Sequence, residues 1–206
     1  MAPTHGGRLF TNQSAMTEAD YDAYMRESYP GISSAALDYV TTTLYPAKYD
    51  GSLPYTTAVE RLQVTVAESL FNCHCYGADR AYNTSAYDYT FAVPPGLHFQ
   101  DTKYTFYNGP FPNVSETLAE DMQTYFTRFA DKGSPNSDSA LPYWPSFAEG
   151  EAGVLLKNEG ISNGSKLDAA AVVRCLFWLS GDIFLENPAS SVHHSDGSSK
   201  HVTGPL

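Results

Sequence analysis

The chain has 206 residues, of which 42% are hydrophobic and 14% aromatic, and its formal net charge at pH 7 is −11. This apolar content is too high for an intrinsically disordered protein, and the acidic balance argues against nucleic acid and anionic membranes as partners. No apolar run approaches the roughly 20 residues that cross a bilayer, and the first residues lack the apolar stretch of a secretory signal peptide.

The first half of the chain predicts an opening loop over residues 1–14 and then four helices, recognised from caps and from apolar residues at helical spacing. The helices are expected at about 18–28, 33–44, 57–71 and 74–82. Thr17 is a typical N-cap, and Thr57 with Glu60 matches the T-x-x-E capping box. One face of the third helix carries apolar residues at helical spacing, namely Val59, Leu62, Val66 and Leu70.

The second half predicts short strands between helices. Alternating β-formers indicate strands over 87–93 and 153–156, while Ser115 and Asp168 are expected to cap helices. Helices with isolated strands between them are typical of an α/β or α+β arrangement with few strands. The last residues, 187–206, lose all periodicity and are expected to form a disordered tail.

Few residues suggest chemistry. The nucleophile motif G-x-S-x-G and the glycine-rich phosphate-binding loops do not occur in the sequence. His98 follows the first predicted strand and a Pro-Pro-Gly turn, which is a suitable place for a general base. The alternative is that His98 is a loop histidine without a catalytic role.

The cysteines allow two interpretations. Cys73-His74-Cys75 offers soft ligands for zinc, but the spacing is short for a zinc site and no fourth ligand is evident, so we expect no metal. The preferred interpretation is a disulfide between Cys175 and either Cys73 or Cys75, which leaves one cysteine free.

Four N-x-S/T sequons suggest an extracellular glycoprotein, because roughly one or two are expected by chance. They begin at Asn12, Asn83, Asn113 and Asn163. Chance occurrence is the alternative.

Five segments form an ordered pattern across most of the chain. They are Gly7-Arg8-Leu9-Phe10-Thr11; Phe71-Asn72-Cys73; Gly96-Leu97-His98-Phe99-Gln100-Asp101; the run from Met122 to Ala130 with Gly133-Ser134-Pro135-Asn136 and Leu141-Pro142-Tyr143-Trp144-Pro145; and Arg174-Cys175-Leu176-Phe177-Trp178. The first segment resembles D-E-G-x-x-F, and the second resembles the first cysteine of a late disulfide. The third resembles G-x-x-H-G-x-[DE], and the fourth resembles W-x-x-F-A-x-x-G-x-P-N with L-P-x-W-P. The last resembles C-x-F-W. These are motifs of the type-B carboxylesterases, the cholinesterase and fungal lipase branch of the α/β-hydrolases.

The resemblance implies that residues 1–186 are the C-terminal portion of such a domain, an incomplete α/β fold with the last strands and flanking helices. It implies hydrolysis of small-molecule or lipid esters through an acyl-serine, without a cofactor, by a secreted protein. His98 would take the proton from the serine and give it to the leaving alcohol. Cys73 and Cys175 would form the disulfide, leaving Cys75 over.

The departures from the family pattern are as informative. The family serine has no counterpart in the sequence, Gly6 stands where the family has the triad Glu, and Phe99 replaces the small residue usual after the histidine. We therefore expect the chain to be inactive alone and to expose a sheet edge and apolar helix faces. The alternatives are a non-catalytic cholinesterase-like interaction module and an unrelated small domain. The sequence carries no signal for oligomeric state.

Overall fold

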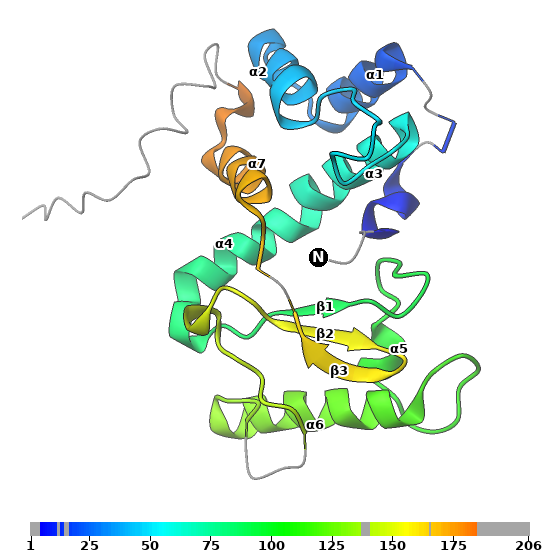
Figure 1. Cartoon of the computed structure of the whole chain (residues 1–206), viewed down its shortest axis with the longest axis vertical. Helices are drawn as coiled ribbons and strands as arrows, with labels where there is room; N and C mark the ends of the chain where they lie inside the picture. Colours follow the sequence, from blue (N-terminus) through cyan, green and yellow to red (C-terminus); the bar gives the residue numbers. More distant parts are fainter. Residues whose placement is uncertain (1–4, 12, 15–16, 137–140, 165, 185–206) are drawn as a thin grey trace, which may run out of the picture.

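The computed structural model describes residues 5–11, 13–14, 17–136, 141–164 and 166–184 (Figure 1). The expected tail, residues 187–206, and the sequon at Asn12 lie outside these residues. The helices are α1 (Glu18–Ser28), α2 (Ser34–Tyr39), α3 (Ala58–Ala67), α4 (Cys73–Tyr82), α5 (Thr102–Thr105), α6 (Glu116–Lys132) and α7 (Ala169–Ser180). The strands are β1 (Tyr89–Phe91), β2 (Val154–Lys157) and β3 (Gly160–Asn163).

The described chain contains two hydrophobic cores. In Figure 1 the helices α1, α2, α3 and α7 lie together above the sheet, and α3 and α4 run one after the other across the molecule. The first core fills the helical part and includes Met25, Val40, Leu62 and Phe177, all buried. The second lies between the sheet and α6 and includes Met122, Tyr125, Trp144 and Leu156.

The helix ends follow the predicted caps. The side chains of Thr17, Ser115 and Asp168 each accept a hydrogen bond from the backbone N–H three residues on. Thr57 does the same for the Glu60 N–H, but the Glu60 carboxylate accepts from the backbone and hydroxyl of Thr56. The third helix therefore begins as predicted, with the reciprocal half of its capping box displaced by one residue.

Three local predictions were wrong. The segment His5–Phe10 is a 3-10 helix and not a loop. The strand β3 was missed, because Gly160–Asn163 shows no alternation of β-formers. A π-helical turn over Glu68–Asn72 inserts one extra residue between α3 and α4. This rotates the later positions, so Leu70 is 42% exposed although the helical spacing groups it on one face with Leu62 and Val66, which are buried.

The sheet is small and mixed. β1 pairs with β2 in parallel, with Thr90 opposite Leu155, and β2 pairs with β3 as an antiparallel hairpin. Among the described residues β1 pairs only with β2, so its other edge is open. The loop that precedes β2 is attached to the sheet through Trp144. The indole N–H of Trp144 donates a 2.9 Å hydrogen bond to the carbonyl of Asp88, the residue before β1. The expected open sheet edge is therefore present in the described part of the chain.

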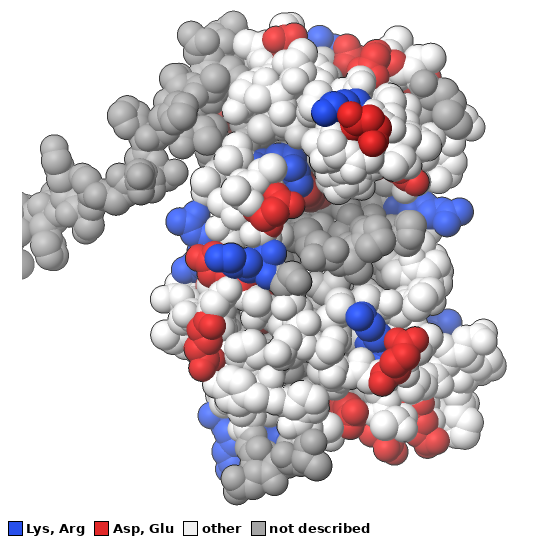
Figure 2. Space-filling model, in the orientation of Figure 1, with Lys and Arg blue, Asp and Glu red and all other residues white. Residues whose placement is uncertain are grey.

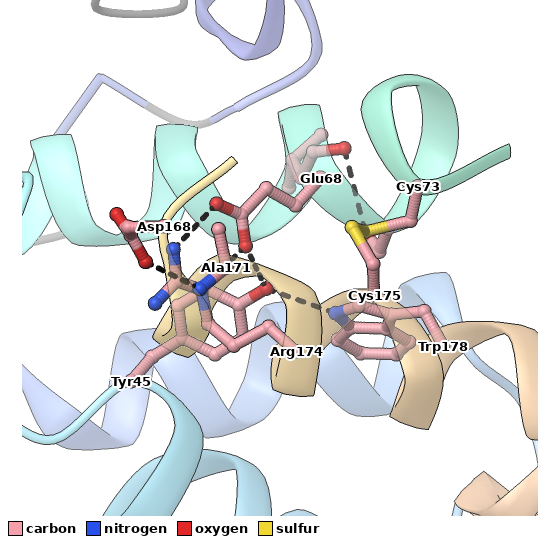
Figure 3. Close-up of a disulfide and its surroundings, with 10 residues drawn as sticks. Tyr45, Glu68, Cys73, Asp168, Ala171, Arg174, Cys175 and Trp178 are labelled. Atoms are coloured by element: carbon pink, nitrogen blue, oxygen red, sulfur yellow. Dashed lines mark hydrogen bonds and ion pairs between the residues drawn. A yellow bond between two sulfur atoms is a disulfide. The ribbon is translucent and has the colours of Figure 1, made fainter. Parts of the chain in front are cut away.

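A disulfide and a buried ion pair join α7 to the helix formed by α3 and α4 (Figure 3). The disulfide links Cys73 to Cys175, the pairing that the resemblance implies. One turn before Cys73, Glu68 receives two hydrogen bonds from Arg174, 2.7 and 2.8 Å long, and one of 2.6 Å from the Tyr45 hydroxyl. The long helix is thus held to α7 at two neighbouring points.

The charged surface shows no concentrated basic region on the face drawn in Figure 2, where Lys and Arg lie in separate small groups. Within the described residues, no helix has both the length and the apolar character needed to cross a membrane.

Candidate active site around His98

His98 lies in a loop beyond the carboxyl end of β1. The side chain of Gln100 stabilises this loop at two points: its carbonyl accepts from the Leu97 N–H over 3.0 Å, and its amide donates to the Pro94 carbonyl over 3.1 Å. Ligands of open α/β sheets bind outside the carboxyl ends of the strands. His98 therefore occupies the end of the sheet at which chemistry is expected.

A second contact holds the loop to the strand itself. The Tyr89 hydroxyl, from β1, donates a 2.7 Å hydrogen bond to the Asp101 carboxylate. Burial is the main cause that raises the pKa of Tyr89, and the hydrogen bond to Asp101 adds to it. The Asp101 carboxylate, three residues beyond His98, is thus engaged in a hydrogen bond with Tyr89.

His98 packs in a group of rings that we call the aromatic cluster, formed by Phe10, Phe71, His98 and Phe99. The imidazole stacks on Phe71 with ring centroids 4.4 Å apart. It meets Phe10 and Phe99 edge-on, at 5.3 and 4.1 Å. Phe10 and Phe71 come from distant parts of the sequence, while Phe99 is the residue next to His98. The Phe10 contact lies within the range of about 4.5–7 Å that aromatic pairs favour, and the other two contacts are slightly shorter, so three rings surround the imidazole.

Phe10 reaches His98 because its 3-10 helix lies directly on α3. A Cβ atom added at Gly7 would stand 2.1 Å from the Gln63 carbonyl oxygen, so only glycine allows this approach. The Tyr24 hydroxyl donates to the Phe10 carbonyl. The structure thereby brings together two segments that carry the family resemblance, the one containing Gly7 and Phe10 and the one containing His98.

Among the described residues, no side chain makes a hydrogen bond to the His98 imidazole, and no group of three His, Cys, Asp or Glu side chains is placed to hold a metal ion. The side chain of His98 is partly exposed. A partly exposed imidazole packed against apolar rings is chemically able to accept and return a proton, but here no carboxylate of the described residues fixes its orientation.

The other predicted site residues lie apart from His98. Cys75 has no disulfide and is exposed on α4. The three sequon asparagines that the structure describes are exposed, which is what attachment of a glycan requires. They are Asn83, Asn113 and Asn163.

Sequence reasoning missed the aromatic cluster and the buried group around Glu68. Phe10 and Phe71 are far from His98 in the sequence, and nothing in their local pattern marks them as its neighbours. Glu68 and Arg174 each lie among apolar residues of a helix. Charged residues at such positions are almost never fully buried unless they are paired, so they are the signal that could have indicated a buried ion pair.

The comparisons with known proteins show the family of the chain. A model of the carboxylesterase family matches residues 9–178. The chain belongs to the carboxylesterase family. Among curated proteins, the carboxylesterase patB of Aspergillus clavatus is 32% identical over 168 residues, which cover 78% of this chain and 29% of that protein. The carboxylesterase patB of Penicillium expansum is 27% identical over 176 residues, covering 84% of this chain and 30% of its own length.

A solved structure supports the fold. Aspergillus niger EstA superposes with a TM-score of 0.66 at 18% sequence identity, over 86% of this chain and 38% of EstA. The chain thus has part of an α/β-hydrolase fold, as expected from the sequence. It spans less than a third of the length of the two carboxylesterases that it matches.

Proposed function

We propose that this chain is the histidine-bearing, C-terminal portion of a serine carboxylic ester hydrolase, acting on small-molecule or lipid esters. In this proposal His98 accepts the proton of a serine hydroxyl as it attacks the ester carbonyl, and then donates that proton to the leaving alcohol. The observation that carries the proposal is the placement of His98 beyond the carboxyl end of β1, within a chain of the carboxylesterase family.

The same proposal assigns the serine and the oxyanion-hole donors to sequence outside these 206 residues. The chain contains no G-x-S-x-G motif, and Gly6 stands at the position that resembles the triad glutamate. Triad members act together, so a histidine without the nucleophile gives negligible catalysis. The open edge of β1 is where we expect the rest of the sheet to pair.

Two esterase assays test the proposal. The 206-residue chain alone should hydrolyse p-nitrophenyl acetate no faster than buffer. In a chimera, residues 9–178 replace the matching segment of the Aspergillus clavatus patB carboxylesterase, and we expect turnover that His98→Ala reduces at least 100-fold. His74→Ala is the matched control, because His74 is exposed on α4 and lies outside the aromatic cluster.

A folded chimera in which His98→Ala retains its turnover would contradict the catalytic role of His98. A cooperative thermal transition in both variants establishes that they are folded. If the folded chimera has no turnover at all, the non-catalytic interaction module becomes the better explanation.

We also propose that the protein is a secreted glycoprotein. The exposure of Asn83, Asn113 and Asn163 supports this, since all three are accessible to glycosylation. Expression through a eukaryotic secretory pathway, followed by removal of N-glycans with a glycosidase, should lower the mass. An unchanged mass would contradict the proposal.

A further inference from the structure

Phe99 has an unusual backbone for its residue type. Its φ angle is +66°, in the left-handed region that favours glycine. A bulky residue in this region is strained, because its Cβ atom crowds the following carbonyl oxygen. Such strain tends to persist at functional sites, where the surrounding structure holds the residue in place.

The packing of Phe99 does not repay this strain. Its side chain is 72% exposed, so it buries little apolar surface. Within the described part of the chain its ring contacts His98 alone among aromatic rings, edge-on at 4.1 Å. The ring of Phe99 therefore lies against the imidazole of its sequence neighbour, His98, and contributes little to either hydrophobic core.

This contact places the Phe99 ring on one side of the imidazole. A substrate atom that approaches the imidazole from that side, at a hydrogen-bond distance of roughly 3 Å, lies next to the Phe99 ring. Phe71 covers one face of the imidazole and Phe10 meets its edge. A ligand at His98 thus meets an apolar and largely aromatic wall.

We infer that Phe99 is a specificity-determining residue, whose ring forms an aromatic wall beside His98 that selects esters carrying a flat aromatic group. The inference rests on the proposed function, because it needs an ester to be bound at His98. Aromatic pairs prefer edge-on or offset geometry, which an aryl ester can adopt against the exposed Phe99 ring and a saturated ring cannot.

The experiment measures binding to the 206-residue chain, so that it does not depend on turnover. The probes are N-phenylacetamide and N-cyclohexylacetamide, which are amide analogues of an aryl and a saturated ester. Each is titrated while the ring protons of His98 are followed by NMR. We expect saturable shifts and an affinity for the aromatic amide about threefold to tenfold higher than for the saturated amide.

Three variants test the role of the ring. Phe99→Gly relieves the backbone strain and should abolish the preference for the aromatic amide. Phe99→Leu keeps an apolar side chain and should abolish it too, if aromaticity is the cause. Phe106→Leu is the matched control, because Phe106 is 74% exposed and has no described ring contact with His98, so the preference should remain.

A preference that persists in Phe99→Gly, or native chain that binds both amides equally, would overturn the inference. The esterase chimera separates this failure from that of the proposed function. If the chimera depends on His98 but the amides bind without preference, only the role of Phe99 is wrong. If the preference is present while the chimera has no turnover, the esterase proposal is wrong and the aromatic site remains.

Discussion

The buried ion pair between Glu68 and Arg174 offers the sharpest test of how the helical part is stabilised (Figure 3). Glu68 is 4% exposed and Arg174 5% exposed, and the guanidinium donates to both carboxylate oxygens. Although burial lowers the pKa of Arg174, the hydrogen bonds and charge of Glu68 raise it overall. Replacing Glu68 by Gln leaves a buried guanidinium without its counter-charge.

The expected loss is large. Removing one partner of a buried ion pair costs about 3–5 kcal/mol, because the other charge remains desolvated. The Tyr45 hydroxyl also loses a charged acceptor, while Trp178 continues to donate to Tyr45 over 2.9 Å. Since domains are stable by only about 5–15 kcal/mol, Glu68→Gln should remove a major part of the free energy of unfolding.

The assay is urea unfolding of the whole chain, followed by tryptophan fluorescence, with free energies from linear extrapolation. Lys132→Met is the control, because Lys132 and Asp131 form an exposed pair and its loss should leave the midpoint unchanged. The double variant Glu68→Leu with Arg174→Met should recover part of the loss, since an apolar pair needs no counter-charge, although the buried Tyr45 hydroxyl then lacks its acceptor. A Glu68→Gln chain within about 1 kcal/mol of the native chain would refute this reasoning.

Three further variants are expected to change stability in the same assay. Removal of the disulfide by Cys73→Ala with Cys175→Ala should lower the free energy of unfolding by about 2–5 kcal/mol, because the bond closes a loop of 102 residues. Replacement of the exposed Cys75 should cause no measurable change. Gly7→Ala should cost about 1–3 kcal/mol, since the added carbon meets the Gln63 carbonyl, and an unchanged midpoint would show that the 3-10 helix does not lie on α3. Burial, with the nearby Asp79 charge, raises the pKa of Asp88 to about 6. The folded state therefore binds the Asp88 proton more tightly than the unfolded state, and the free energy of unfolding should fall as the pH rises from about 4 to 6. Asp88→Asn should remove most of that fall and raise the free energy of unfolding by roughly 2–3 kcal/mol at pH 7. If the variant keeps the pH dependence of the native chain, Asp88 is not its cause.

The helices were predictable because their signals are local. Thr17, Ser115 and Asp168 act as N-caps where the sequence indicates, and Gly133 ends α6 in the left-handed conformation. Capping depends on residues within one turn of the helix end, so a single sequence contains the necessary information. The prediction failed at Leu70 because the π-helical turn changes the helical period, and no local residue type signals that turn.

The candidate site was predictable only in part. His98 was identified from its loop and from the motif that surrounds it, but its neighbours were not. Phe10 and Phe71 reach the imidazole through the packing of separate helices, which a periodic pattern does not specify. The role of Phe99 was expected only as a bulky departure from the family pattern, and its positive φ angle and exposure required the structure.

The stabilising contacts and the candidate site are mechanically connected through Phe71. Phe71 lies on the π-helical turn between Glu68 and Cys73, and both of these residues are bound to α7, through Arg174 and through the disulfide. The ring that supports the His98 imidazole is therefore positioned by α7. In the esterase chimera, a loss of turnover on Glu68→Gln would follow from displacement of Phe71 without any chemical role for Glu68. If proton NOEs in Glu68→Gln show that the Phe71–His98 ring contact is retained, the ion pair does not position the candidate site through Phe71.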